Sequence, residues 1–369
     1  MQLDGRRALA WRLRRHGLDP ASGTDATDVA ERVLAVRGWP DRTADLAFGV
    51  RLAEPVPDVV PRAVEVGELI RSYAFRGGSY VFAPEIGAVL LAVRTVTAIW
   101  RTDRWQRQGD IVVDDWEPVR DAIRTALADG PLTRDEIAEH LRRSPTLRRL
   151  ADAAATGAGA DTLYKPLHWW GDICFGPARG RQATFRLLRG DPHWPGLPDV
   201  EDAGRRAIVH YLHAYGPATE ANLQYWLSEG LGVPTRRLAG WLAELADVVT
   251  AVSMDGLPCL ALTADLDEMA ATEPSDAVVL LPGYDPWMLG PGTADPLIVT
   301  PARRALITNG GNAIIRDGQV CGTWRPHAHT VMVSWFAEAG PAPSHRLADG
   351  VRRLGAVVWN ELQLDIAPH

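Results

Sequence analysis

A repeated unit in the middle of the chain constrains the fold more than any other feature. Residues 119–188 read as a helix with apolar side chains at every fourth position, a Gly-Pro stop, two further helices and two strands around a short turn. Residues 203–264 repeat this order, and Gly216–Thr219 stands where Gly130–Thr133 stands in the first copy. Because an internal repeat indicates one supersecondary unit used more than once, we predict two winged helices, each with three helices followed by a β-hairpin.

Local signals sharpen the first copy of this unit. Thr133 and Glu136 have the spacing of a capping box, in which each side chain accepts a hydrogen bond from the other residue's backbone amide. Pro166 is expected to interrupt the third helix, because proline lacks the amide hydrogen that a helix interior uses.

The N-terminal part carries a less regular version of the same pattern. A proline-broken connector is predicted at Glu54–Pro61, and two short strands around Gly77-Gly78 predict a hairpin. Helices before this hairpin are predicted at Arg6–His16, Val29–Val36 and Asp45–Leu52, and one after it at Glu85–Gln106. We therefore expect a first winged helix here.

The C-terminal part changes to apolar runs separated by turns, including the hairpin signal Asp317-Gly318. The predicted fold class is therefore α+β, with tandem winged-helix units and a β-rich C-terminal domain. The predicted domains are 1–110 (first winged helix and a following helix), 111–195 (second winged helix), 196–272 (third winged helix) and 273–369 (β-rich domain).

Positive charge gathers on the hairpin of the second unit. The whole chain has a net charge of −7, yet no acidic residue occurs between Asp172 and Asp191. The arginines on or beside this hairpin are Arg179, Arg181, Arg186 and Arg189. They predict contact with nucleic-acid phosphates, and a solvated arginine face is the alternative. The hairpin of the third unit turns at Asp255-Gly256 without arginine, so we expect it to be structural or to face another domain.

Other function classes lack their sequence signals. The three cysteines are far apart, and neither His210 with His213 nor His327 with His329 has a third metal ligand nearby in sequence. Phosphate-binding loops and dinucleotide fingerprints are also missing from the sequence. We predict no metal and no cofactor. Without a signal-peptide core or a long apolar run, we expect a cytoplasmic protein with no membrane partner.

Five motifs, in the same order along nearly the whole chain, resemble the AlkZ-like (YcaQ-like) winged-helix DNA glycosylases. They are Ala35–Arg51, Ile70–Gly78, Trp169–Pro177, Leu280–Trp287 and Asp317–Trp324. The resemblance implies three tandem winged helices and a β-rich part that enclose DNA in a concave basic channel. It also implies excision of alkylated bases, unhooking of interstrand crosslinks, and double-stranded DNA as the partner.

One motif departs from the family pattern. Family members carry glutamine, a hydrophobic residue and glutamine, or a variant that ends in aspartate, where this chain has Arg37-Gly38-Trp39. An arginine does not act as a general base at neutral pH. The remaining nearby candidates for catalysis are Asp41 and Asp45, whose other interpretation is helix capping or a surface position.

The sequence therefore favours a DNA-binding protein whose catalytic centre is altered or lost. The first alternative is an active glycosylase with an unconventional water-positioning residue, and the second is a winged-helix protein-interaction module. Trp39 and Trp324 are expected to stack on bases. The predicted nucleic-acid contacts are Arg37, Trp39, Arg76, Arg179, Arg181, Arg186, Trp324 and Arg325.

Overall fold

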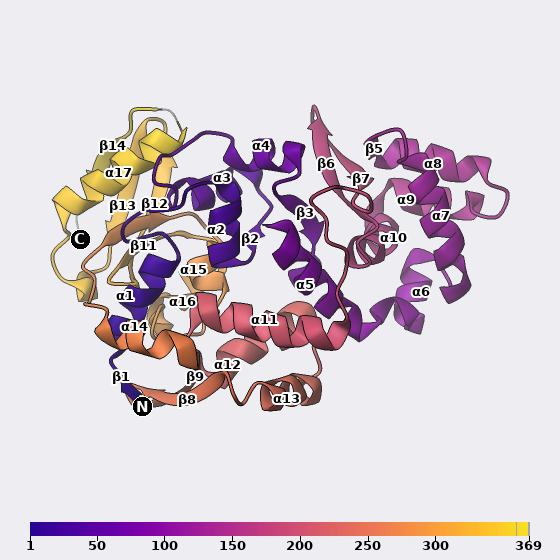
Figure 1. Cartoon of the computed structure of the whole chain (residues 1–369). Helices are drawn as coiled ribbons and strands as arrows, with labels where there is room; N and C mark the ends of the chain where they lie inside the picture. The colour runs from indigo at the N-terminus through magenta and orange to yellow at the C-terminus, as the bar shows by residue number, and fades with distance from the viewer. Residues whose placement is uncertain (359, 368–369) are drawn as a thin grey trace.

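The computed structural model describes residues 1–358 and 360–367, and it begins its repeating architecture after one N-terminal helix (Figure 1). The first unit consists of α2 (Ala26–Val33), β2 (Val36–Arg37), α3 (Asp41–Gly49), α4 (Val59–Val66), β3 (Ile70–Tyr73) and β4 (Ser79–Phe82). Its strands pair in the order β2-β4-β3. The unit thus runs helix, short strand, two helices and hairpin. The hairpin lies where the sequence predicts it, whereas the third helix, α4, falls in the segment predicted as a connector.

The second unit has the same order of elements except for one additional short helix, α9. It consists of α7 (Trp116–Ala126), β5 (Leu132–Thr133), α8 (Arg134–Arg143), α9 (Ala151–Ala155), α10 (Gly157–Trp169), β6 (Ile173–Arg179) and β7 (Gln182–Leu187), with strands in the order β5-β7-β6. The predicted capping box is confirmed: Thr133 N donates to Glu136 Oε2 at 2.7 Å, and Glu136 N donates to Thr133 Oγ1 at 3.4 Å.

The third unit repeats the pattern again. It consists of α11 (Val200–Tyr215), α12 (Glu220–Leu223), a π-helical segment (Gln224–Gly230), α13 (Thr235–Glu244), β8 (Val249–Met254) and β9 (Leu257–Leu262). Ala218 bridges to Leu260, in the position of the short strand of the other units. The hairpin faces another part of the chain, because β1 (Gln2–Leu3) pairs with β8 and Gly5 N donates to both carboxylate oxygens of Asp255.

Three sequence predictions about helices are wrong. Pro166 does not interrupt α10. The proline has no amide hydrogen to donate to the Thr162 carbonyl, and this carbonyl accepts the indole N–H of Trp105 at 3.2 Å. The proline connector contains the start of α4, where Pro61 occupies the first turn and no intrahelical amide bond is needed. The helix expected at Glu85–Gln106 is two helices, α5 (Pro84–Arg94) and α6 (Asp103–Gly109), since Ala98 between them has a positive φ of 42°.

The C-terminal part is built on a five-stranded sheet. Its elements are α14 (Leu266–Ala271), β10 (Val278–Leu281), α15 (Pro286–Leu289), α16 (Arg304–Thr308), β11 (Asn312–Arg316), β12 (Gln319–His327), β13 (Thr330–Trp335), α17 (Ser344–Val358) and β14 (Gln363–Ile366). The strands follow one another in chain order, antiparallel except for the parallel pair β13 and β14. This sheet bears out the expected β-rich C-terminal region.

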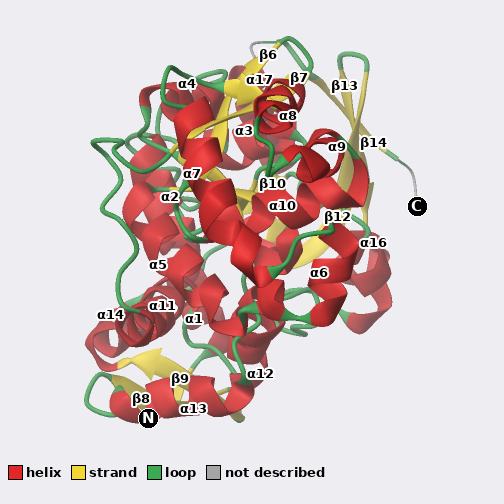
Figure 2. Ribbon diagram, turned by 90° about the vertical axis from the view of Figure 1, so that its right-hand side faces the viewer, coloured by secondary structure: helices red, strands yellow, loops and turns green. Residues whose placement is uncertain are grey.

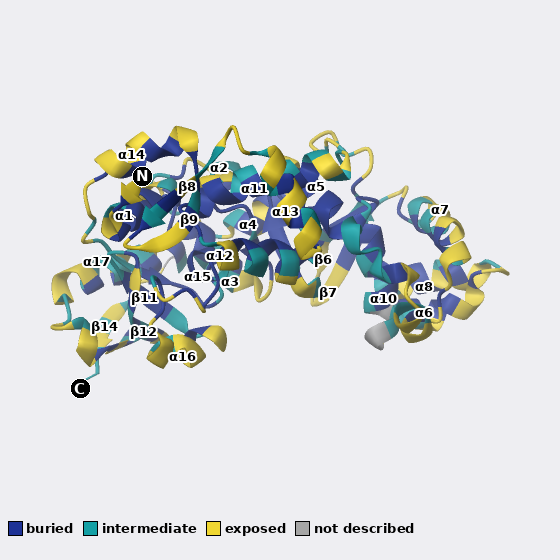
Figure 3. Cartoon of the chain, turned by 90° about the horizontal axis from the view of Figure 1, so that it is seen from below, coloured by how far each residue is buried: buried dark blue, intermediate teal, exposed yellow. Residues whose placement is uncertain are grey.

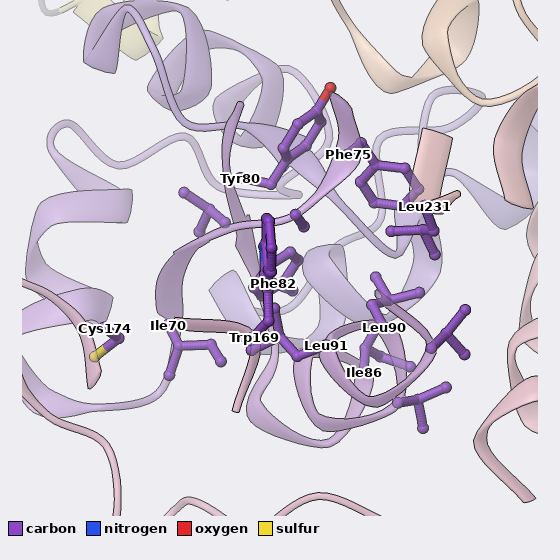
Figure 4. Close-up of a cluster of buried hydrophobic side chains, with 14 of the residues drawn as sticks. Ile70, Phe75, Tyr80, Phe82, Ile86, Leu90, Leu91, Trp169, Cys174 and Leu231 are labelled. Atoms are coloured by element: carbon purple, nitrogen blue, oxygen red, sulfur yellow. The ribbon is translucent and has the colours of Figure 1, made fainter. Parts of the chain in front are cut away.

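Two large hydrophobic cores hold these parts together. One continuous core runs through all three units, and Figure 4 shows Ile70 and Phe82 of the first unit gathered with Trp169 of the second and Leu231 of the third. The other core lies around the C-terminal sheet and includes Leu9 and Leu13 of α1 (Gly5–Arg15). The N-terminal helix therefore packs against the end of the chain rather than within the first unit.

The molecule is an arc when it is viewed from below (Figure 3). The C-terminal sheet forms one end, α6 and α8 form the other, and the β6–β7 hairpin lies on the inner side. The N-terminus lies beside the β8–β9 hairpin, far from the C-terminus (Figure 2). Within the described residues, helices long and apolar enough to cross a bilayer are absent.

Candidate nucleic-acid interface and the altered motif

The altered motif lies at the end of β2, in the first unit. Val36 pairs with Val81 and Arg37 with Tyr80, so the strand is fixed to β4. The Gly38 amide continues this pairing by donating to Ser79 O at 2.9 Å. The backbone that carries the motif is therefore part of a sheet edge rather than a free loop.

Arg37 lies among aromatic rings. Its guanidinium carbon is 4.8 Å from the centre of the Tyr284 ring, and its Nε donates to Trp39 O at 3.3 Å. Burial raises the pKa of Tyr80, while Arg37, which is hydrogen-bonded to that phenol, and Arg76 act in the opposite direction. Among the described residues, carboxylates that pair with Arg37 are absent, so its charge is not neutralised by a salt bridge.

Trp39 projects into solvent. Its side chain is 63% exposed, whereas the other tryptophans that the structure describes are buried or partly buried. Pro40 follows in extended conformation, and α3 begins at Asp41. An exposed indole on an anchored backbone is available for stacking.

Asp41 and Asp45 both have structural partners. Asp41 pairs with Arg71, whose Nη1 lies 2.8 Å from the Asp41 carboxylate. Asp45 accepts the Val60 amide at 2.9 Å, at the start of α4. Burial first, and then the charges of Asp58 and Asp41, raise the pKa of Asp45 to about 6.

The arginines of the β6–β7 hairpin differ in their exposure and in whether a carboxylate pairs with their charge. Arg179 contacts Glu136 Oε2 at 2.6 Å and Pro131 O at 2.7 Å, and this contact helps lower the pKa of Glu136 to about 2. Arg186 is only 17% exposed and pairs with Asp191. Arg181 is exposed, and ion pairs to it are absent within the described residues. The acid-free interval in sequence did not reveal Glu136, because that residue comes from α8.

The remaining predicted contacts divide into exposed and buried side chains. Arg76 lies over the Tyr225 ring at 4.2 Å and is 42% exposed. Arg325 is exposed on β12, and its neighbour Trp324 points to the other face of the sheet. Trp324 is 7% exposed and donates its indole N–H to Leu281 O at 2.9 Å. The prediction that Trp324 stacks on bases is therefore wrong, because its ring belongs to the core.

Sequence reasoning missed the aromatic partners of the two cations. Tyr284 comes from the loop after β10, and Tyr225 comes from the π-helical segment of the third unit. The motif Leu280–Trp287 contains Tyr284 and is its signal in the sequence, whereas Tyr225 lies outside the five motifs. Tyr284 has a positive φ of 60°, so its backbone is held in an uncommon conformation beside Arg37.

One histidine of each pair has a side-chain partner. His213 Nδ1 lies 3.1 Å from Asp265 Oδ2, and His329 Nδ1 lies 3.1 Å from Asn360 Nδ2. Burial lowers the pKa of His210. Within the described part of the chain, groups of three or more His, Cys, Asp or Glu side chains placed to hold a metal ion are absent.

The α+β scaffold combines three helix-and-hairpin units with a C-terminal sheet, and the altered motif lies at the end of β2. The model of the family described as DNA glycosylase AlkZ-like matches residues 30–357, and the chain belongs to this family. An interstrand DNA cross-link repair glycosylase from Streptomyces sahachiroi is 29% identical over 349 residues, which cover 93% of each chain. The solved structure of Streptomyces sahachiroi DNA glycosylase AlkZ has a TM-score of 0.92 and 28% identity, with 100% of both chains covered.

Proposed function

We propose that this protein binds damaged double-stranded DNA on the inner side of its arc and has an altered catalytic centre. The single observation that carries the proposal is the Arg37 cation at the family's motif position. It lies over the Tyr284 ring, is hydrogen-bonded to the Tyr80 phenol and lacks a carboxylate partner among the described residues. The family supports DNA as the partner. The name of the Streptomyces sahachiroi relative, an interstrand cross-link repair glycosylase, supports damaged duplexes as the class of ligand.

Electrostatics argues against efficient removal of a cationic alkylated base. Such a reaction passes through a positively charged sugar, which a catalyst must stabilise. Two like charges about 5 Å apart repel by about 3 kcal/mol at an effective dielectric constant of about 20. A cost of this size would slow the reaction by roughly a hundred-fold. Arg37 also lacks an acceptor that could orient an attacking water.

Excision and binding assays on the same duplexes test the proposal. Wild-type protein should bind duplex DNA with an affinity that falls as salt rises, and should release little base from duplexes with N7-alkylguanine or an interstrand crosslink. The double variant Arg37→Gln with Trp39→Gln should gain excision if the rest of the pocket is intact. Robust excision by the wild type would contradict the proposal that the catalytic centre is altered. Absence of salt-dependent binding would favour a protein-interaction module.

A second candidate function is excision that uses Asp45 in place of the missing glutamines. Its supporting observation is the pKa of Asp45, which at about 6 lies in the range of a general base. Asp45→Asn would then abolish excision, while Asp41→Asn, which changes only the pair with Arg71, would retain it. Equal excision by both variants would remove Asp45 from the mechanism.

A further inference from the structure

Trp39 is the exception among the tryptophans that the structure describes. An indole is mostly buried in folded proteins, and this one leaves 63% of its surface in water. Trp39 belongs to neither of the two large hydrophobic cores. The exposed ring is therefore available to a ligand outside the folded chain.

The backbone around Trp39 is fixed on both sides. Before it, Gly38 is tied to Ser79, and a Cβ on Gly38 would lie 3.2 Å from Arg71 Nε, which leaves little room for movement. At the residue itself, Arg37 Nε holds the Trp39 carbonyl. After it, Asp41 pairs with Arg71. The indole is thus presented by a pre-organised segment, which lowers the entropic cost of binding.

In this segment a flat exposed ring stands next to a cation, Arg37, for which the described part of the chain supplies no carboxylate. Bases stack on aromatic rings, and phosphates pair with arginine. Inserting a side chain into intact duplex DNA costs a few kcal/mol for unstacking, as a general rule. That cost falls where pairing and stacking are already disrupted, and a position that has lost its base leaves an open space in the stack. The pair of residues is therefore best matched to a nucleotide without a base.

We propose that Trp39 and Arg37 form a recognition site for abasic nucleotides in duplex DNA. The indole occupies the space of the missing base and stacks on the neighbouring base pairs, and Arg37 contacts a flanking phosphate. Because the ligand is neutral at the sugar, the Arg37 cation does not oppose it as it opposes a cationic lesion. This inference rests on the proposed DNA binding and names the form of DNA that the altered site prefers.

Affinity measurements on two matched duplexes test the inference. One duplex is intact, and the other carries a tetrahydrofuran abasic analogue at one central position. Wild-type protein should bind the abasic duplex roughly ten-fold more tightly, which is the size of one stacking contact. Trp39→Ala should bind the two duplexes with equal affinity, whereas Trp39→Phe should retain part of the preference for the abasic duplex. Leu257→Ala, on an exposed residue of the third hairpin, is the matched control and should change neither affinity.

A spectroscopic readout separates stacking from a general effect on binding. With 2-aminopurine next to the abasic position, wild-type protein should quench its fluorescence and Trp39→Ala should not. Equal affinity of the wild type for both duplexes, or a preference that survives in Trp39→Ala, would overturn the inference while leaving DNA binding intact. Absence of salt-dependent binding to either duplex would instead overturn the proposed function and this inference with it.

Discussion

At the scale of single residues, a buried ion pair joins the first unit to the C-terminal part. Arg51 and Asp285 form two hydrogen bonds of 2.9 and 2.7 Å, and both side chains are fully buried. Arg51 also donates to Ala47 O, and Asp285 accepts the Trp287 amide at the start of α15. Water does not reach this pair, so each charge is balanced mainly by the other.

Removing only one partner of this pair should destabilise the protein strongly. Asp285→Ala leaves a buried guanidinium without its counter-charge, so we expect the free energy of unfolding to fall by about 3–5 kcal/mol. The double change Arg51→Met with Asp285→Leu should recover most of that loss. Urea unfolding of the single and double variants measures the coupling. Additive losses would contradict the interdependence of the two charges.

The half-buried Asp45 should make stability depend on pH in a defined window. Its pKa is raised from 3.8 to about 6 in the folded protein. The neutral carboxyl therefore stabilises the fold in full below about pH 4, and this contribution is lost as the pH rises through about 6. Relative to the wild type, Asp45→Asn should gain about 1–2 kcal/mol at pH 7, after allowance for solvent screening, and almost nothing at pH 4. Chemical unfolding at both pH values, with Asp41→Asn as control, checks the difference.

At the scale of elements, local sequence signals predicted the repeated units. They did not predict features that depend on contacts with residues far away in the chain. The capping pair Thr133 and Glu136 lies within one helical turn, and its geometry follows from sequence alone. The continuity of α10 through Pro166 depends on the indole of Trp105, which lies far away in the chain. The rings beside Arg37 and Arg76 likewise come from distant segments, the C-terminal part and the third unit. The motif could therefore be found in the sequence, but the aromatic residues around it could not.

The wing arginines should contribute unequally to DNA binding. Arg181 is exposed and free of ion pairs within the described residues, whereas Arg179 is neutralised by Glu136. Arg181→Ala should therefore reduce the salt slope of DNA affinity by roughly one unit, and Arg179→Ala by less. Glu136→Gln retains an acceptor for the helix cap and frees Arg179, so it should raise affinity at low salt. Equal slopes for all three variants would place this hairpin outside the interface.

At the scale of the whole molecule, the first helix connects parts that are distant in sequence. Leu9 and Leu13 belong to the core of the C-terminal sheet, and Arg12 donates to Tyr215 O at 2.6 Å and to Pro217 O at 3.2 Å in the third unit. The boundary predicted at residue 273 therefore separates the sheet from part of its own core. We propose that 273–369 is not an independent folding unit.

A fragment experiment tests this dependence. Residues 273–369 alone should lack the cooperative unfolding transition of a packed sheet, because the apolar surface that Leu9 and Leu13 cover would be exposed. Adding a peptide of residues 1–20 should restore part of the transition in circular dichroism. The same peptide with Leu13→Ala, which removes a fully buried side chain, should restore less. Cooperative unfolding of the fragment alone would contradict the proposed dependence.

The position of α1 has a consequence for synthesis on the ribosome. This helix leaves the exit tunnel long before Leu280, Val351 and Leu354, which belong to the same hydrophobic core. At about 5–20 residues per second, its apolar face waits for on the order of tens of seconds before its partners emerge. Chaperones that shield nascent helices would find their target here, and chains that stop before the sheet is made would keep that face exposed.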